Sequence, residues 1–158
     1  MKLLFICTHN RCRSILSEAI ANHIGGDKLT AASAGSSPQG EVHPLTLKYL
    51  SEKGIDTSNL NSQSWHDFED FKPDVVLTMC DNAAKETCPV WFGDLLQINW
   101  ALTDPSKSND DEKKQKEAFY QTIDIIERRI KAVLEIETST LSKQELKNKF
   151  LDIAKRIK

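Results

Sequence analysis

Short apolar runs alternate with longer amphipathic stretches along most of this 158-residue chain. Four segments have the length and apolar content of buried strands, namely residues 3–6, 28–33, 74–79 and 95–98. In three longer stretches, apolar positions recur about every 3.6 residues. The sequence therefore predicts helices from about Arg13, over 44–53 with Gly54 as the stop, and over 110–136.

This alternation of strand and helix is typical of a parallel sheet whose two faces are covered by helices. We therefore predict an α/β fold of three layers, in which an open parallel four-stranded sheet lies between helices and the crossovers are right-handed. In such sheets a ligand binds beyond the carboxyl ends of the strands, where the strand order reverses. The loop after the first strand is the expected place.

The last part of the chain, residues 137–158, forms an extension to the predicted domain of residues 1–136. Ser142 and Glu145 have the spacing of a capping box, and the apolar residues Leu146, Phe150 and Ile153 follow. We therefore predict one more amphipathic helix at the C-terminal end. The pattern leaves open whether this helix docks on the domain, pairs with a second chain or covers a partner surface.

Charge and cysteine content narrow the function classes. The chain has 21 basic and 23 acidic residues, a net charge of -2, and the two signs are interspersed, so we expect no nucleic-acid binding. The first apolar run is too short for a signal peptide or a membrane span, so we expect a cytoplasmic protein that binds no membrane. We also expect it to be a monomer. In that reducing compartment, four cysteines indicate chemistry rather than a disulfide scaffold.

The segment from Cys7 to Ser14 combines a nucleophile with anion-binding groups between the first strand and the first helix. Its amides can curl around a tetrahedral oxyanion at the positive end of the helix. Arg13 adds a planar fork for two oxygens, Ser14 can donate its hydroxyl to the Cys7 sulfur, and Asn10 can hold the loop backbone. The residues expected to bind the oxyanion are Thr8, His9, Asn10, Arg11, Cys12, Arg13 and Ser14.

A plainer interpretation exists for several of these residues. A cysteine that ends a strand is commonly a small buried apolar residue, but the placement of Cys7 before an amphipathic helix favours an active site. For the Cys12 side chain we favour packing beneath the anion site, without a role in turnover. The histidines and cysteines lack metal-ligand spacing, so we expect no metal and no cofactor.

The loop resembles the phosphate-binding loop of low-molecular-weight protein tyrosine phosphatases and of the arsenate reductases built on the same flavodoxin-like fold. Ser33-Ala34-Gly35, the strand at 74–79 and Asp104-Pro105 follow in the family's order, so the resemblance covers about the first 135 residues. It implies that Asp104 acts as a general acid facing the loop. From the residues alone, Asp-Pro also indicates a simple turn.

Cys80 and Cys88 resemble the redox pair of thioredoxin-coupled arsenate reductases. The resemblance implies a Cys7–arsenate adduct, a Cys7–Cys80 disulfide as arsenite leaves, and then a Cys80–Cys88 disulfide that thioredoxin reduces, in the service of arsenic detoxification. Glutathione with glutaredoxin stays open as the reductant. If the segment between Cys80 and Cys88 is helical, part of it must loosen before the two thiols can bridge.

Two other functions stay open. Cys7, Arg13 and Asp104 would suffice for a phosphatase acting on phosphotyrosine or on a small phosphate ester, and a regulator that only binds an oxyanion would need still less. Ser106 and Lys107 follow Pro105 where phosphatases of this family usually carry aromatic residues, which disfavours phosphotyrosine.

The resemblance also raises the question of a potassium ion. Some members bind one near the loop, and Asn10, Glu18 and Ser33 match their ligands. Gln63 stands where those members have an aspartate.

Overall fold

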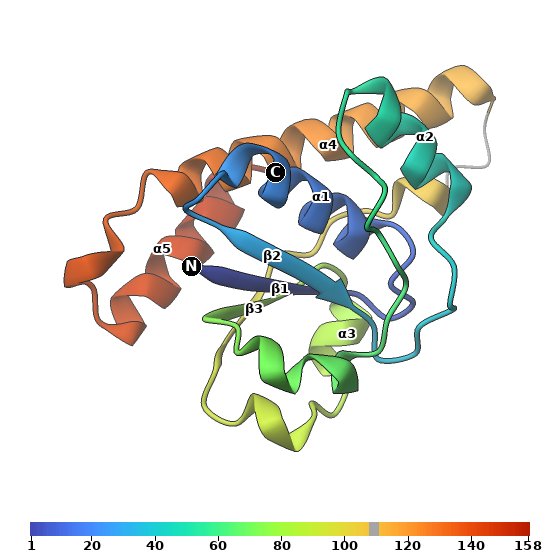
Figure 1. Ribbon diagram of the computed structural model, residues 1–158. Coiled ribbons are helices and arrows are strands. Elements are labelled where there is room, and N and C mark those ends of the chain that lie inside the picture. The colour runs from blue at the N-terminus through green and yellow to red at the C-terminus, as the bar shows by residue number, and fades with distance from the viewer. Residues whose placement is uncertain (108–110) are drawn as a thin grey trace.

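A computed structural model describes residues 1–107 and 111–158 of the chain, and its centre is one parallel sheet (Figure 1). The strands lie in the order β2-β1-β3-β4. Their bounds are β1 Lys2–Ile6, β2 Thr30–Ala34, β3 Val75–Thr78 and β4 Leu96–Asn99. Every residue of β3 and the last four of β1 are buried, as expected for central strands that are covered on both faces.

The helices confirm the predicted alternation. Their bounds are α1 Arg13–Gly25, α2 Pro44–Glu52, α3 Asp81–Lys85, α4 Glu112–Leu134 and α5 Lys143–Arg156. In Figure 1, α1 and α4 lie on one side of the sheet, while α3 and the 3₁₀ turn Trp65–Phe71 lie on the other. The predicted three-layer α/β fold is therefore confirmed.

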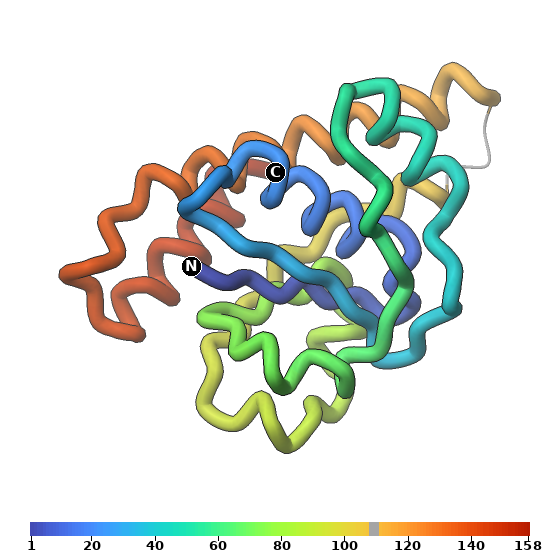
Figure 2. The backbone as a smooth tube through the Cα atoms, viewed as in Figure 1, coloured from blue at the N-terminus to red at the C-terminus, as the bar shows by residue number. Residues whose placement is uncertain are grey.

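The strand order places a crevice beside β1. The chain passes from β1 to β2 on one side and then returns across β1 to β3, so the connections after β1 and after β3 leave the sheet in opposite directions. The segment after β2 and the segment before Trp65 run side by side along this end of the sheet (Figure 2), joined by a hydrogen bond from the Gly40 amide to the Ser62 hydroxyl.

The C-terminal helix docks on the domain, which answers a question that the sequence left open. Phe150 and Ile153 of α5 are buried, and the Trp100 indole N–H donates to the Phe150 carbonyl oxygen at 2.9 Å. The helix begins with the predicted capping box, in which Ser142 and Glu145 satisfy each other's backbone amides. Burial of the apolar face against β4 and α4 therefore fixes the position of α5.

Some element bounds differ from the prediction. The second strand begins at Thr30 rather than Lys28, because the Lys28 amide closes the end of α1 by donating to the Gly25 carbonyl. The long helix ends at Leu134 rather than at residue 136, and its predicted start at Asp110 lies outside the described residues. The 3₁₀ turn Trp65–Phe71 was not predicted, although its apolar residues Trp65, Phe68 and Phe71 recur every three residues, the period of a 3₁₀ helix.

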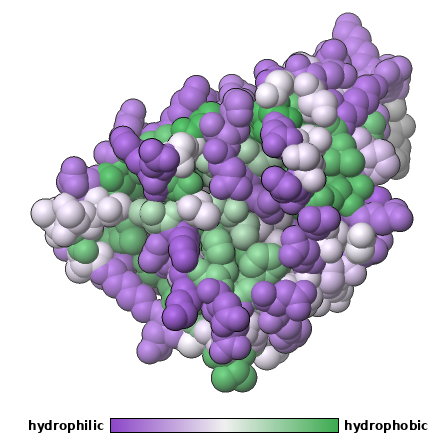
Figure 3. Space-filling model, in the orientation of Figure 1, coloured by the Kyte–Doolittle hydropathy of each residue, from purple (hydrophilic) through white to green (hydrophobic). Residues whose placement is uncertain are grey.

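Two surface properties complete the fold. No helix among the described residues is long and apolar enough to cross a membrane. On the face drawn in Figure 3, hydrophilic side chains are spread over the surface rather than gathered into one stripe.

Candidate active site

Hydrogen bonds to the backbone carbonyl groups of the loop after β1, residues 7–12, attach this loop to a neighbouring segment. These carbonyl groups accept backbone hydrogen bonds from the segment after β2: Ser37 to Thr8 at 2.9 Å, Gln39 to His9 at 3.1 Å and His43 to Arg11 at 3.1 Å. No backbone carbonyl among the described residues accepts a hydrogen bond from the N–H groups of residues 8–12. A loop with outward carbonyls and unused amides, leading into the N-terminus of α1, is suited to bind an oxyanion.

Asn10 and Gly35 fix the shape of this loop. Asn10 has φ 49°, a left-handed conformation that asparagine adopts more readily than most residues. Its buried side chain donates to the Ser14 hydroxyl at 2.7 Å and to the Ser33 hydroxyl at 3.1 Å. It also accepts from the Gln63 backbone amide at 2.7 Å. Gly35 permits close approach, because a β-carbon there would lie 2.6 Å from the Thr8 carbonyl oxygen.

The Cys7 sulfur lies at the bottom of the loop, 2.8 Å from the Ser14 hydroxyl oxygen. Because that oxygen already accepts a hydrogen bond from Asn10, the hydrogen of the Ser14 hydroxyl is available to the sulfur. Cys7 is buried, so water does not compete for this hydrogen bond. The Ser14 hydroxyl is thus placed to donate to the sulfur when Cys7 acts as a nucleophile.

The Arg13 guanidinium links the loop to the segment after β4. It donates from one terminal nitrogen to the Leu102 carbonyl oxygen at 2.9 Å, and the other terminal nitrogen lies 3.6 Å from the Asp104 carboxylate. Its Nε–H is buried and has no hydrogen-bond partner among the described residues. A buried donor without an acceptor is costly, and an oxyanion in the loop would supply one.

Asp104 lies at the start of the 3₁₀ turn Pro105–Lys107 and faces the loop. One carboxylate oxygen accepts from both the amide and the hydroxyl of Ser106, at 3.0 and 2.6 Å. The other oxygen points to Arg13. Asp104 therefore forms a turn, as its sequence pattern alone indicates, and it also lies at the anion loop.

Cys80 and Cys88 occupy different surroundings. Cys80 follows the end of β3 by two residues and is the N-cap of α3; its buried sulfur accepts a hydrogen bond from the Ala83 amide at 3.4 Å and lies 3.7 Å from the Thr8 hydroxyl. Cys88 is partly exposed and lies 3.1 Å from the Gln97 side-chain oxygen. Only residues 81–85 of the intervening segment are α-helical.

Most of the predicted residues line one cavity of about 300 Å³, but Asn10 and Ser14 do not. Cys7, Arg13, Cys80 and Asp104 all line it, whereas Cys88 does not. His43, which was not predicted as a site residue, also lines this cavity, and its ring caps α2 by accepting from the Leu45 backbone amide. Burial and the neighbouring Arg11 charge lower the pKa of His43, so its ring is neutral at neutral pH.

A second unpredicted residue, Glu86, connects the cysteine segment to the loop. Its carboxylate accepts a hydrogen bond from the Thr8 hydroxyl at 3.0 Å. Glu86 follows α3 directly, so this contact joins the segment between Cys80 and Cys88 to the residue after Cys7. No sequence pattern identifies such a long-range pair.

Cys12 is buried and Glu18 is partly buried near the loop, and burial shifts the pKa of each side chain. Burial raises the pKa of the Cys12 thiol to about 12, which fits the packing role that we predicted for this side chain. Burial also raises the pKa of Glu18, whose carboxylate accepts from the Ser33 hydroxyl at 2.6 Å.

The surroundings of Glu18 do not fit a potassium site. Asn10 directs its N–H group, a donor, toward Ser33 and uses its oxygen for the Gln63 amide. Glu18 and Ser33 alone offer too few oxygen ligands, and we derive no step through a metal.

Comparison with known proteins finds similarity over most of the chain. A family model described as low molecular weight phosphotyrosine protein phosphatase matches residues 2–149, which extends into α5. The arsenate reductase of Bacillus subtilis is 34% identical over 134 residues, covering 84% of this chain and 94% of that protein.

Comparison with solved structures also finds similarity to arsenate reductases. One described as an arsenate reductase in the phosphate binding state has a TM-score of 0.69 and 27% identity, covering 84% of this chain and 95% of that one. The thioredoxin-dependent arsenate reductase of Corynebacterium glutamicum has a TM-score of 0.63 and 30% identity, covering 84% of this chain and 59% of that one.

Proposed function

The chain belongs to the low molecular weight phosphotyrosine protein phosphatase family, and on that premise we propose that it is an arsenate reductase, which converts arsenate to arsenite for detoxification. One observation carries the proposal: Cys7 and Cys80, from the ends of two different strands, line the same cavity as Arg13 and Asp104. Cys12 also lines this cavity, but hydrolysis of a phosphate ester has no use for the further thiol that Cys80 brings from a separate strand connection. The similarity to the arsenate reductase of Bacillus subtilis supports the same branch.

The first step forms a covalent adduct on Cys7. Its thiolate attacks arsenate held by the loop amides and by Arg13, so that a sulfur–arsenic bond forms and an arsenic–oxygen bond breaks. Asp104 delivers a proton to the departing oxygen, which leaves as water. Arsenic keeps its oxidation state of five in this step. The unused amides of residues 8–12 and the partnerless Arg13 Nε–H are the groups that would stabilise the oxyanion.

The second step moves two electrons to arsenic. The Cys80 thiolate attacks the Cys7 sulfur, and a Cys7–Cys80 disulfide forms as the sulfur–arsenic bond breaks. The electron pair of that bond stays on arsenic, which leaves as arsenite. The position of Cys80 at the rim of the same cavity supports this order of events.

The third step transfers the oxidation to the surface. The Cys88 thiolate attacks the Cys80 sulfur, so that the Cys7 thiolate is released and a Cys80–Cys88 disulfide forms. Because Cys88 is partly exposed and Cys7 is buried, the new disulfide is the one that a protein reductant can reach. We assign thioredoxin to this role, since the Corynebacterium glutamicum relative is thioredoxin-dependent. The non-helical residues between Lys85 and Cys88 are free to rearrange for the bridge.

The test is NADPH consumption with arsenate, with thioredoxin and its reductase in one arm and glutathione, glutaredoxin and glutathione reductase in the other. Hydrolysis of p-nitrophenyl phosphate runs in parallel as a readout that needs only the anion loop. Cys80→Ser should abolish arsenate reduction and spare any ester hydrolysis, whereas Cys7→Ser should abolish both. Cys88→Ser should release one arsenite per enzyme and then stop as a Cys7–Cys80 disulfide.

Two results would contradict the proposal. Arsenate reduction that survives Cys80→Ser would remove the relay and would make an external thiol the resolving group. Rapid ester hydrolysis without arsenate-dependent turnover in either arm would establish the second candidate, a phosphatase that uses Cys7, Arg13 and Asp104.

A further inference from the structure

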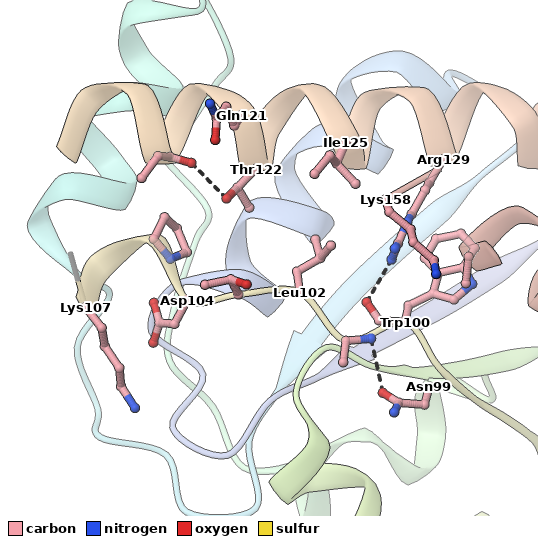
Figure 4. A pocket seen from close by; sticks show the side chains of 15 residues that line it. Asn99, Trp100, Leu102, Asp104, Lys107, Gln121, Thr122, Ile125, Arg129 and Lys158 are labelled. Carbon is pink, nitrogen blue, oxygen red and sulfur yellow. Dashed lines mark hydrogen bonds between the residues drawn. The ribbon is translucent and has the colours of Figure 1, made fainter. Parts of the chain in front are cut away.

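A second and larger cavity lies beside the candidate active site. Its volume is about 800 Å³, and it is bounded by the segment from Asn99 to Lys107, by α4 and by the end of α5. Figure 4 shows Asp104 and Lys107 at one end and Arg129 and Lys158 at the other, with Leu102 and Ile125 between them. Cavities of roughly 300 to 1,000 Å³ with an apolar middle and a few polar groups are typical of small-molecule sites.

Arg129 is unusual for an arginine, because only 2% of it is exposed. It donates to the Ile157 carbonyl oxygen at 2.9 Å and to the Trp100 carbonyl oxygen at 2.8 Å. These contacts engage Nε and Nη1, and they leave Nη2 without an acceptor among the described residues. No aspartate or glutamate of the described chain forms an ion pair with it. A buried charge is normally paired, so this guanidinium lacks the counter-charge that its burial calls for.

The charged side chains around the cavity are mostly positive. Three cationic side chains line it, those of Lys107, Arg129 and Lys158, against one acid, Asp104. That acid is already engaged by Arg13 and Ser106. Burial also lowers the pKa of Arg129 to about 10, and no carboxylate counters this effect. A bound anion would supply the missing counter-charge.

We infer that this cavity is a binding site for a small organic anion, with its carboxylate or phosphoryl group at Arg129 and Lys158 and its apolar body against Leu102 and Ile125. The bound ligand would contact the segment that carries Asp104 and the Leu102 carbonyl that Arg13 binds. This inference does not depend on which reaction the anion loop catalyses.

The experiment is an NMR titration of the full-length ¹⁵N-labelled protein. The probes are benzoate and phenylphosphonate, which distinguish the two acidic groups, and benzamide, which is a neutral molecule of similar shape. The amide signals of residues 8–12 report any phenylphosphonate that binds in the anion loop, so that it is told apart from phenylphosphonate in the cavity. The signals to follow are the Trp100 indole N–H and the Arg129 Nε–H, because both groups are at the proposed anion end.

Two variants test the site in different ways. Arg129→Met removes the charge and should weaken binding about 10- to 100-fold, as expected for the loss of a hydrogen bond between charged groups. Arg128→Met is its matched control, because Arg128 is exposed and pairs with Asp124 outside the cavity. Ile125→Trp narrows the part of the cavity where the apolar body would lie and leaves Arg129 in place, so it tests the site even where Arg129→Met fails to fold.

The inference requires saturable shifts with at least one of the two anions, weaker or no shifts with benzamide, and loss of binding in Arg129→Met or Ile125→Trp but not in Arg128→Met. Benzoate alone would identify a carboxylate ligand, and phenylphosphonate alone a phosphoryl ligand. Equal binding of benzamide, unchanged affinity in Ile125→Trp, or no saturation below about 50 mM for either anion would overturn it.

Discussion

Gly35 offers a direct test of how the shape of the anion loop controls binding. A β-carbon at this position would lie 2.6 Å from the Thr8 carbonyl oxygen and 3.0 Å from the Cys7 carbonyl oxygen. Both atoms belong to the backbone of the loop, which is fixed by hydrogen bonds on its outer side and cannot yield as a flexible side chain would. Gly35→Ala must therefore displace the loop or the end of β2.

The expected cost has two parts. Overpacking of this kind destabilises a fold by about 1–3 kcal/mol, which urea denaturation measures. Displaced amides also lose hydrogen bonds to the anion, and the loss of one such bond weakens phosphate binding about 10- to 100-fold in isothermal titration calorimetry. Any activity of the loop should fall at least as far, because misplacement by about 1 Å can cost a factor of 100.

Gly25→Ala is the matched control. A β-carbon there would also meet an atom at 2.6 Å, but that atom is the Leu29 β-carbon, at the end of α1 away from the loop. It should lower stability and leave phosphate affinity unchanged. If Gly35→Ala binds phosphate within about twofold of Gly25→Ala, the reasoning about close approach is wrong.

Three further predictions concern buried groups and a helix cap. Because burial raises the pKa of Glu18 above its ordinary 4.5, ionisation of this side chain opposes folding at neutral pH. Glu18→Gln should therefore raise the free energy of unfolding at about pH 8. The gain should vanish below about pH 4, where wild-type Glu18 is protonated in both the folded and the unfolded state. An equal gain at both pH values would show that desolvation is not the cause. With a pKa of about 12, Cys12 should resist iodoacetamide at about pH 8 while Cys88 reacts, which peptide mass spectrometry of the native protein measures; equal labelling would contradict this. Ser142→Ala should cost about 1 kcal/mol in urea denaturation, since it removes the hydroxyl that accepts from the Glu145 amide; an unchanged midpoint would mean that the cap contributes nothing.

Much of the fold could be predicted from periodicity alone. The run at residues 3–6 and the amphipathic pattern after Arg13 specify a strand and a helix locally, because a short continuous apolar run is typical of a strand buried on both faces and the 3.6-residue repeat decides which face a helix buries. The capping box at Ser142 is likewise a local signal. Bounds at Lys28 and residue 136 were less certain, because the ends of elements depend on single hydrogen bonds.

Part of the candidate site could likewise be predicted from neighbouring residues, and part could not. Adjacency in the sequence was enough to suggest that Cys7, Arg13 and Ser14 act together. The approach of Asp104 and Cys80 to the same loop was suggested by the resemblance and then appeared in the geometry of one cavity. The contact between Thr8 and Glu86 had no signal in the sequence, since it joins residues from separate connections.

The sequence by itself determined the strands, most of the helices and the anion loop, since each depends on residues that are neighbours along the chain. Only the tertiary structure decided that α5 docks on the domain and that Arg129 is buried beside a large cavity. Both outcomes depend on which apolar faces meet when the layers pack. Packing brings together residues far apart in the chain, and no local pattern records their partners.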